Sequence, residues 1–229
     1  MSKNPYIIDG QQQIKKSFCV YLDILGFRNI IIEKHSKNKS QEHFEQIYNI
    51  LADAVNMYND NPKDIFAKDD TVQYRIFSDN IVFGIPYSCI GDGEPEFGNI
   101  IMQVAYFQLM LATEGFFVRG GMTLGDLYIG EELVYGKALL DAYEIENTVS
   151  VYPRVVVSEI VKKEIKNQLR SYTKVRGSPF ANEIRVDTDG NWFIDYLWTT
   201  IDEKDGKVID EYAFKHKCKF RPNPAPDSD

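Results

Sequence analysis

The sequence predicts a layered α/β fold in which helices cover one sheet within a single domain, and three observations carry this prediction. Strand-like and helix-like segments alternate along the chain in the order β-α-α-β-β-α-β-α-β. Residues 18–25 (FCVYLDIL) are apolar at almost every position, which is typical of a central strand covered on both faces. The 229 residues are 44% hydrophobic, which is enough to bury a substantial core.

Local signals place the elements of the first half. After the first strand, residues 26–36 (GFRNIIIEKHS) are expected to turn and open a short helix. In residues 40–60, apolar side chains recur at helical spacing from Phe44 to Tyr58, so this segment predicts a longer helix. In residues 72–86 (VQYRIFSDNIVFGIP), apolar runs flank the turn formers SDN, which predicts two strands around a tight turn.

The second half continues the alternation of helices and strands. Gly115 is expected to end a helix, and five glycines interrupt the strand region that follows, where they mark bends or close backbone approach. The expected elements are a helix over 97–115, strand character over 116–136, a helix over 137–148, a short strand over 154–158, a charged helix over 159–172 and a strand-like run over 191–200.

Composition narrows the functional classes. A formal net charge of −8 argues against coating nucleic acid or an anionic membrane, because both uses need clustered Lys and Arg. The three cysteines are widely spaced and form no C-x-x-C pair, so neither a disulfide framework nor a zinc site is indicated. No apolar run approaches the length of a membrane span. We therefore expect a cytoplasmic protein without nucleic-acid or membrane partners.

Asp23 is the anomaly in the first strand. A carboxylate buried alone usually neutralises, pairs with a base or coordinates a metal. Asp79, at the tip of the SDN hairpin, is another carboxylate within apolar strands, and the two would converge if the first strand lies beside that hairpin. Magnesium held by one or two carboxylates and by substrate phosphates fits such a pair. Taken singly, an Asp that caps the next helix and an ordinary SDN turn remain alternatives.

The residues after Asp23 suit a phosphate. Gly26 permits close backbone approach, and a helix that begins near Phe27 directs free N–H groups and the positive end of its dipole outward. The sequence therefore indicates a triphosphate site next to a divalent cation.

Several segments resemble motifs of the class III nucleotidyl cyclases, the family of adenylate and guanylate cyclase domains. VYLDILGF is similar to the first-strand motif, RIFSDNIVF to the metal-binding hairpin, and the later block FFVRGGMTLGDLYIGEELVYGKALLDAYEIE to the glycine-containing strand and helix of that family. The motifs stand in family order over about residues 17–158. The resemblance implies a ferredoxin-like domain whose central, mostly antiparallel sheet is flanked by helices.

The resemblance also implies a domain division. The nucleotidyl cyclase catalytic domain would span 17–170, after an N-terminal extension over 1–16. A strand-containing C-terminal extension packed on the same domain would span 171–221. The Pro-rich, acidic composition of residues 222–229 (PNPAPDSD) predicts a disordered tail.

The resemblance assigns site residues to this chain. Asp23 and Asp79, with the Ile24 carbonyl, would bind two Mg²⁺ or Mn²⁺ ions per active site. The backbone of Leu25, Gly26 and Phe27 would hold the β and γ phosphates. The ribose 3′-hydroxyl of a nucleoside triphosphate would then attack the α-phosphate, and pyrophosphate would leave. A head-to-tail homodimer with active sites at the interface is also implied.

This chain departs from the purine cyclases of the family. The positions that orient ribose and stabilise the transition state correspond to Leu140 and Glu144, and the adenine-reading lysine and its acidic partner correspond to Arg75 and Leu133. Small stand-alone cyclases of bacterial Pycsar antiphage systems combine such losses with an intact metal site. The resemblance to that branch implies UTP, or CTP as second choice, as substrate and a cyclic pyrimidine mononucleotide as a second messenger.

Three further residues are candidates for binding substrate. Arg119 could stabilise an anionic transition state, and a surface ion pair is an equally good interpretation. Lys137, near a helix start, could bind phosphate, although a solvated lysine is the more common case. Tyr48 could face the base from the long helix, although an aromatic residue at this spacing usually belongs to the core.

Two other sets of ionisable residues are not expected to take part in catalysis. Glu144 and Glu146 could pair with Arg119 or Arg154, but a solvated helix face is the preferred interpretation. The three histidines show no ligand spacing, so neither zinc nor a general base is expected from them.

Other functional classes compete with a pyrimidine cyclase. A catalytically weak cyclase-fold module that binds nucleotide to regulate a partner would explain Leu140 and Glu144, whereas the retained carboxylates Asp23 and Asp79 favour an enzyme. A purine cyclase is a further alternative. An RNA-binding ferredoxin-like domain is disfavoured by the acidic charge and by the lack of an aromatic RNP-type strand.

Overall fold

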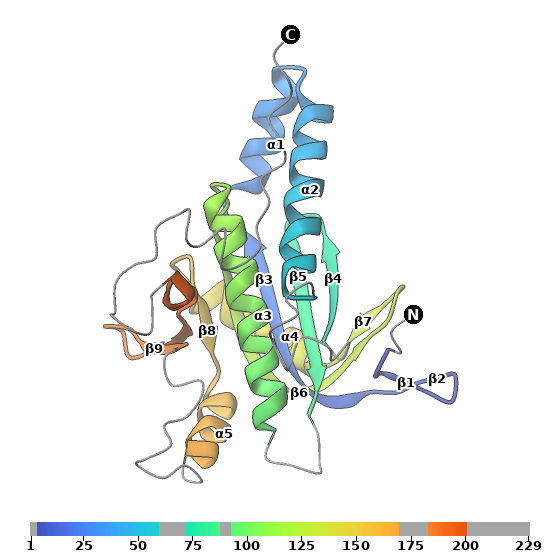
Figure 1. The fold of residues 1–229 in the computed structure, drawn as a ribbon, viewed down its shortest axis with the longest axis vertical. Coiled ribbons are helices and arrows are strands. Elements are labelled where there is room, and N and C mark those ends of the chain that lie inside the picture. Colours follow the sequence, from blue (N-terminus) through green and yellow to red (C-terminus); the bar gives the residue numbers. More distant parts are fainter. Residues whose placement is uncertain (1–3, 60–71, 88–92, 170–182, 201–229) are drawn as a thin grey trace.

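The computed structural model describes residues 4–59, 72–87, 93–169 and 183–200 (Figure 1). The elements in chain order are β1 (Ile7–Ile8), β2 (Gln11–Gln12), β3 (Lys15–Ile24), α1 (Phe27–Ser36), α2 (Ser40–Asn59), β4 (Gln73–Phe77), β5 (Asn80–Pro86), α3 (Glu94–Thr113), β6 (Val118–Ile129), β7 (Val134–Tyr135), α4 (Lys137–Thr148), β8 (Val155–Val157), α5 (Glu159–Leu169), β9 (Ile184–Val186), β10 (Trp192–Ile194) and the 3₁₀ helix η1 (Tyr196–Thr200).

One large sheet organises the molecule, as predicted. Its strands follow the order β4-β5-β3-β6-β8-β10-β9, and β7 pairs with β6 at one side. All neighbours are antiparallel except β6 and β8. The central strand β3 places Asp23 opposite Asn80 of β5 on one side and opposite Arg119 of β6 on the other. The register thus brings three distant segments together at the end of β3.

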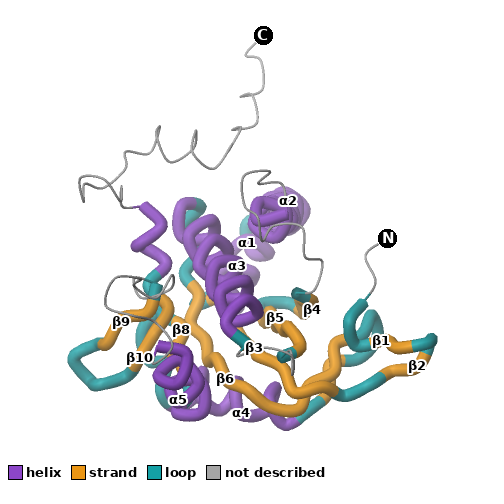
Figure 2. Tube along the Cα trace, turned by 60° about the horizontal axis from the view of Figure 1, so that its bottom comes forward, coloured by secondary structure: helices purple, strands orange, loops and turns teal. Residues whose placement is uncertain are grey.

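Helices cover both faces of the sheet because side chains alternate along β3. Phe18, Val20, Leu22 and Ile24 belong to the larger core, which α2 and α3 complete. Cys19 faces the opposite side, where it packs in a smaller core with residues of α4. Figure 2 shows α1, α2 and α3 on one side of the sheet and α4 on the other. The prediction of a central strand covered on both faces is confirmed.

Strand β6 is continuous, so the predicted break in the strand region 116–136 falls at Gly130, between β6 and β7, and not at the earlier glycines. It runs through Gly120, Gly121 and Gly125 without a break. The glycines serve close approach instead: a Cβ on Gly120 would lie 2.4 Å from the Tyr21 carbonyl oxygen, and one on Gly121 would lie 2.3 Å from the Ala142 carbonyl oxygen. Their lack of a side chain lets β6 pack tightly between β3 and α4.

Other local predictions need correction. Phe44 is 59% exposed, whereas Ile47, Leu51 and Val55 of the same predicted stripe are buried in the core. The run 191–200 forms only the short strand β10 before it turns into the 3₁₀ helix η1. The N-terminal hairpin β1–β2 was not predicted. The tail over 222–229 lies outside the described residues.

None of the described helices combines the length and the apolar character that a bilayer crossing requires.

Candidate active site

The backbone brings Asp23 and Asp79 to one point. The N–H of Ile24, directly after Asp23, donates a hydrogen bond of 3.0 Å to the carbonyl oxygen of Asp79. Asp79 stands in the β4–β5 turn, and Ser78 before it adopts a left-handed φ of 59° that shapes this turn. The Asn80 side chain donates to the Asp79 carboxylate at 3.1 Å and accepts from the Tyr21 hydroxyl, which orients the tip of the hairpin.

The two carboxylates influence each other electrostatically. Burial raises the pKa of Asp23 above its ordinary value, Arg119 opposes this rise, and Asp79 adds to it. A rise caused by Asp79 means that ionising both groups is unfavourable. A divalent cation between them would remove this cost.

The donor set fits a hard divalent cation. Within the described ranges, no cluster of three or more His, Cys, Asp or Glu side chains could hold a metal ion. If a divalent cation binds at the end of β3, Asp23 and Asp79 would provide two carboxylates, and substrate oxygens and water would complete the coordination, as is common for Mg²⁺.

Asp23 also has a basic partner, which the sequence interpretation missed. The Nε of Arg119 lies 3.5 Å from the Asp23 carboxylate and 2.6 Å from the Glu146 carboxylate. Glu146 is only 3% exposed, so its expected place on a solvated helix face is wrong, whereas Glu144 is exposed as predicted. Burial raises the pKa of Glu146, and Arg119 opposes this rise. One guanidinium thus lies between two carboxylates.

A signal for Glu146 was present in the sequence. Ala138, Ala142 and Glu146 recur every four residues and form the buried face of α4. A carboxylate on the buried stripe of a helix needs a cation. Arg119 of β6 is that cation.

Removing the Glu146 carboxylate is expected to destabilise the protein. Truncating one partner of a buried ion pair leaves the other charge uncompensated, at a cost of about 3–5 kcal/mol. Arg119 keeps Asp23 as a weaker partner, so we expect Glu146→Ala to lower the free energy of unfolding by about 3 kcal/mol. Glu144→Ala, two residues away on the exposed face, is the control and should cost less than about 0.5 kcal/mol. Urea denaturation measures both, and equal losses would contradict a structural role of the pair.

The predicted phosphate loop leads directly into α1. Gly26 has a left-handed φ of 74°, and its carbonyl oxygen accepts from the Asn29 and Ile30 amides of the first helical turn. The Leu25 amide donates to the Phe117 carbonyl at 2.8 Å, so it is engaged and not free to bind phosphate as the resemblance implied. In the part of the chain that is described, the Gly26 and Phe27 amides have no hydrogen-bond acceptor. These two remain suited to an anion.

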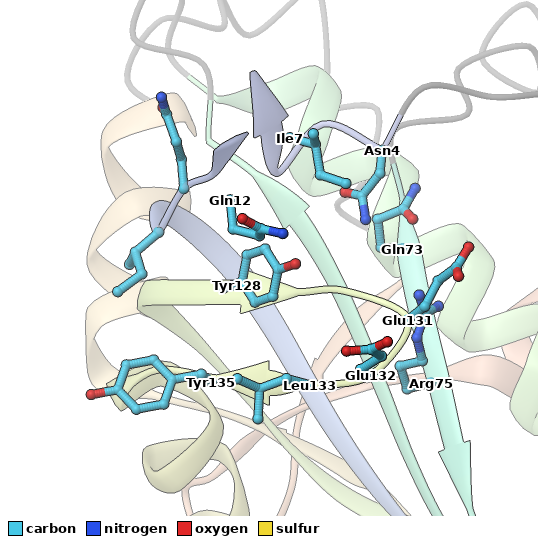
Figure 3. A pocket seen from close by; sticks show the side chains of 12 residues that line it. Asn4, Ile7, Gln12, Gln73, Arg75, Tyr128, Glu131, Glu132, Leu133 and Tyr135 are labelled. Atoms are coloured by element: carbon cyan, nitrogen blue, oxygen red, sulfur yellow. The ribbon is translucent and has the colours of Figure 1, made fainter. Parts of the chain in front are cut away.

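A cavity of about 760 Å³ is lined by residues of the N-terminal segment, of β4 and of the β6–β7 hairpin (Figure 3). Arg75 and Leu133, the two positions assigned to base reading, both line it. Arg75 is fixed by two hydrogen bonds of 2.5 Å, from Nε to the Gly130 carbonyl and from Nη1 to the Tyr74 carbonyl. Its Nη2 has no partner among the described residues. A cavity of this volume is of the size that holds small ligands.

The cavity also contains carboxylates. Glu131 and Glu132, at the tip of the turn that precedes Leu133, belong to its lining. The Gly130 amide donates to the Leu133 carbonyl at 2.8 Å and closes this turn. The position of Leu133 itself carries no carboxylate, and acidic side chains stand one and two residues before it in the cavity lining.

The fold has counterparts among solved structures. The catalytic core of a rhodopsin-guanylyl cyclase with converted specificity, solved with ATPαS, superposes with a TM-score of 0.52 at 14% identity and covers 80% of this chain and 96% of that one. The monomeric guanylyl cyclase domain of the RhoGC fusion protein from Blastocladiella emersonii gives 0.50 at 14% identity, over 79% and 95%. This chain has the guanylyl cyclase fold.

Other comparisons add no functional detail. A class III adenylyl cyclase-like ATP-binding protein from Pseudomonas aeruginosa superposes with a TM-score of 0.48 at 12% identity, over 71% of this chain and 39% of that protein's length. Neither protein-family models nor curated protein sequences give a match.

Three residues that the sequence linked to substrate binding or to catalysis in purine cyclases do not line the cavity. Tyr48 is 62% exposed on α2, where its ring lies 6.0 Å from that of Phe44. Lys137 forms an exposed ion pair with Asp141 at 2.6 Å. Leu140 is 66% exposed on α4. The structure thus groups Asp23, Asp79 and Arg119 at the end of β3, next to Ile24 and residues 25–27, and places Tyr48, Lys137 and Leu140 outside the cavity lining.

Proposed function

We propose that the protein is a pyrimidine nucleotidyl cyclase that converts UTP, or CTP as second choice, to the 3′,5′-cyclic mononucleotide and pyrophosphate. The observation that carries this proposal is the meeting of Asp23, Asp79 and Arg119 at the end of β3, beside the amino end of α1, in a guanylyl cyclase fold. Two carboxylates, one guanidinium and free amides are the groups that an in-line phosphoryl transfer needs.

Each group has a role in the proposed reaction. Asp23 and Asp79 would hold Mg²⁺ or Mn²⁺, which when bound activates the 3′-hydroxyl and neutralises phosphate charge. Arg119 would stabilise the charge of the transition state through its guanidinium, while its Nε keeps the 2.6 Å contact with buried Glu146. The Gly26 and Phe27 amides would bind terminal phosphate oxygens.

The base preference rests on Arg75 and on the sequence resemblance. Arg75 offers only donors, so its Nη2 can bind a carbonyl oxygen of uracil but not the exocyclic amine of cytosine. Leu133, beside it in the cavity, offers an apolar contact. UTP is therefore the first choice. The resemblance to Pycsar cyclases adds the proposal that the product is a second messenger in antiphage defence.

One observation favours a second candidate, a nucleotide-binding module without turnover. Arg119 lies 3.5 Å from Asp23, where it could substitute for a cation. Leu140 and Glu144, at positions where purine cyclases carry catalytic groups according to the resemblance, are consistent with this candidate.

Incubation with each of the four nucleoside triphosphates and Mn²⁺, followed by mass analysis, separates these functions. We expect cyclic UMP as the main product, cyclic CMP second and both purine products well behind. Cyclic AMP or cyclic GMP in equal or larger amount would refute the pyrimidine assignment but not the metal mechanism. Nucleotide binding without any cyclic product would favour the regulatory module.

A further inference from the structure

The N-terminal segment forms one wall of the cavity. Residues 4–14 contribute five of the residues that line it: Asn4, Ile7, Gln12, Gln13 and Ile14. The opposite wall consists of β4 and the β6–β7 hairpin (Figure 3). A segment that the sequence placed outside the catalytic domain therefore faces Arg75 across the cavity.

This wall is held firmly. Tyr6 is fully buried in the smaller core, and its ring lies 6.1 Å from that of Tyr128. The Asn4 side chain donates to the Ile129 carbonyl at 2.8 Å, and the Gln13 amide donates to the Tyr6 carbonyl at 2.9 Å. These contacts fix the β1–β2 hairpin against β6, so its side chains keep their positions relative to the cavity.

Gln12 differs from the charged groups of the cavity in what it can bind. Arg75 can only donate hydrogen bonds, and the carboxylates of Glu131 and Glu132 are acceptors. The carboxamide of Gln12 both donates and accepts, and within the described residues it makes no side-chain hydrogen bond. Figure 3 shows its amide end extending over Tyr128 into the cavity.

We propose that Gln12 reads the base, by pairing its carboxamide with the imide edge of uracil. The amide oxygen accepts from N3–H and the amide nitrogen donates to the neighbouring carbonyl, while Nη2 of Arg75 donates to the other carbonyl. This assignment rests on the proposed function, because it requires the cavity to hold the pyrimidine. It makes the N-terminal hairpin a determinant of specificity.

The test compares two ligands that differ only at N3 and needs no turnover. Binding of UMP and of N3-methyl-UMP is measured by calorimetry with the wild-type chain and with Gln12→Ala. Two neutral hydrogen bonds correspond to about a tenfold difference in affinity. We expect the wild type to bind N3-methyl-UMP at least about tenfold more weakly than UMP, and Gln12→Ala to lose that discrimination to less than about threefold.

Gln11→Ala is the matched control, since Gln11 belongs to the same strand but is not among the residues that line the cavity. It should discriminate like the wild type. Both glutamines are exposed, so neither change should alter the thermal midpoint. Undiminished discrimination by Gln12→Ala would overturn the assignment.

Two outcomes separate this inference from the proposed function. If the wild type binds UMP with the expected discrimination but makes no cyclic UMP from UTP, the proposed cyclase activity is wrong and the role of Gln12 is supported. If the wild type makes cyclic UMP and Gln12→Ala still discriminates against the N3-methyl group, the proposed cyclase activity is supported and the role of Gln12 is wrong. If neither ligand binds to the wild type, the inference is overturned.

Discussion

Asp79→Asn is expected to abolish cyclic nucleotide formation while the fold persists. An amide lacks the second anionic oxygen that a divalent cation needs, and losing this charge stabilisation should lower turnover by about 10²–10³-fold or more. The fold should persist because Asp79 contributes to the raised pKa of Asp23, so the substitution removes a repulsion between the two carboxylates. The asparagine oxygen can still accept the 3.1 Å hydrogen bond from Asn80.

Asp53→Asn provides the control for this experiment, because Asp53 is an exposed carboxylate on α2 away from the end of β3. Turnover with Mn²⁺ and the thermal midpoint are measured for both variants. We expect the control to match the wild type in both quantities. Wild-type turnover by purified Asp79→Asn would remove Asp79 from the site, and a large drop in thermal midpoint would show that its charge stabilises the fold.

Mixing two inactive variants is expected to restore activity if the active sites are shared between subunits. Asp79→Asn would lack a ligand of the proposed metal site, and Arg75→Ala would lack the proposed base-reading donor. In a head-to-tail homodimer that contains one chain of each variant, one active site carries both substitutions and the other active site carries neither. Random exchange makes half of the dimers mixed, so about one quarter of the wild-type activity should return.

The mixing experiment needs each variant alone and a measurement of mass. Each variant by itself should show almost no turnover, and light scattering should report a species larger than the 26.4 kDa chain. Circular dichroism checks that Arg75→Ala keeps its fold, because Arg75 also binds the Gly130 carbonyl. A fully active 26.4 kDa species, or no recovery on mixing two folded variants that exchange subunits, would exclude shared sites.

Local patterns in the sequence were sufficient for several elements. The apolar run that contains Asp23 predicted a buried central strand, because only such a strand is apolar on both faces. The SDN turn between apolar runs predicted the β4–β5 hairpin, and Gly26 predicted the turn before α1. Each of these signals lies within a few residues, where steric limits and side-chain periodicity act directly. The N-terminal hairpin escaped prediction because its strands are only two residues long.

The sequence by itself determined the layered sheet and the carboxylate at the end of its central strand. Only the tertiary structure decided which charges surround that carboxylate. Arg119 reaches Asp23 through the register of β3 against β6, and Glu146 reaches Arg119 because α4 turns its alanine face to the same strand. The cavity likewise forms where residues 4–14 meet β4 and the β6–β7 hairpin. Such contacts depend on strand register and helix docking, which the whole core fixes at once. Local periodicity therefore signals that Glu146 is buried but not which cation it meets.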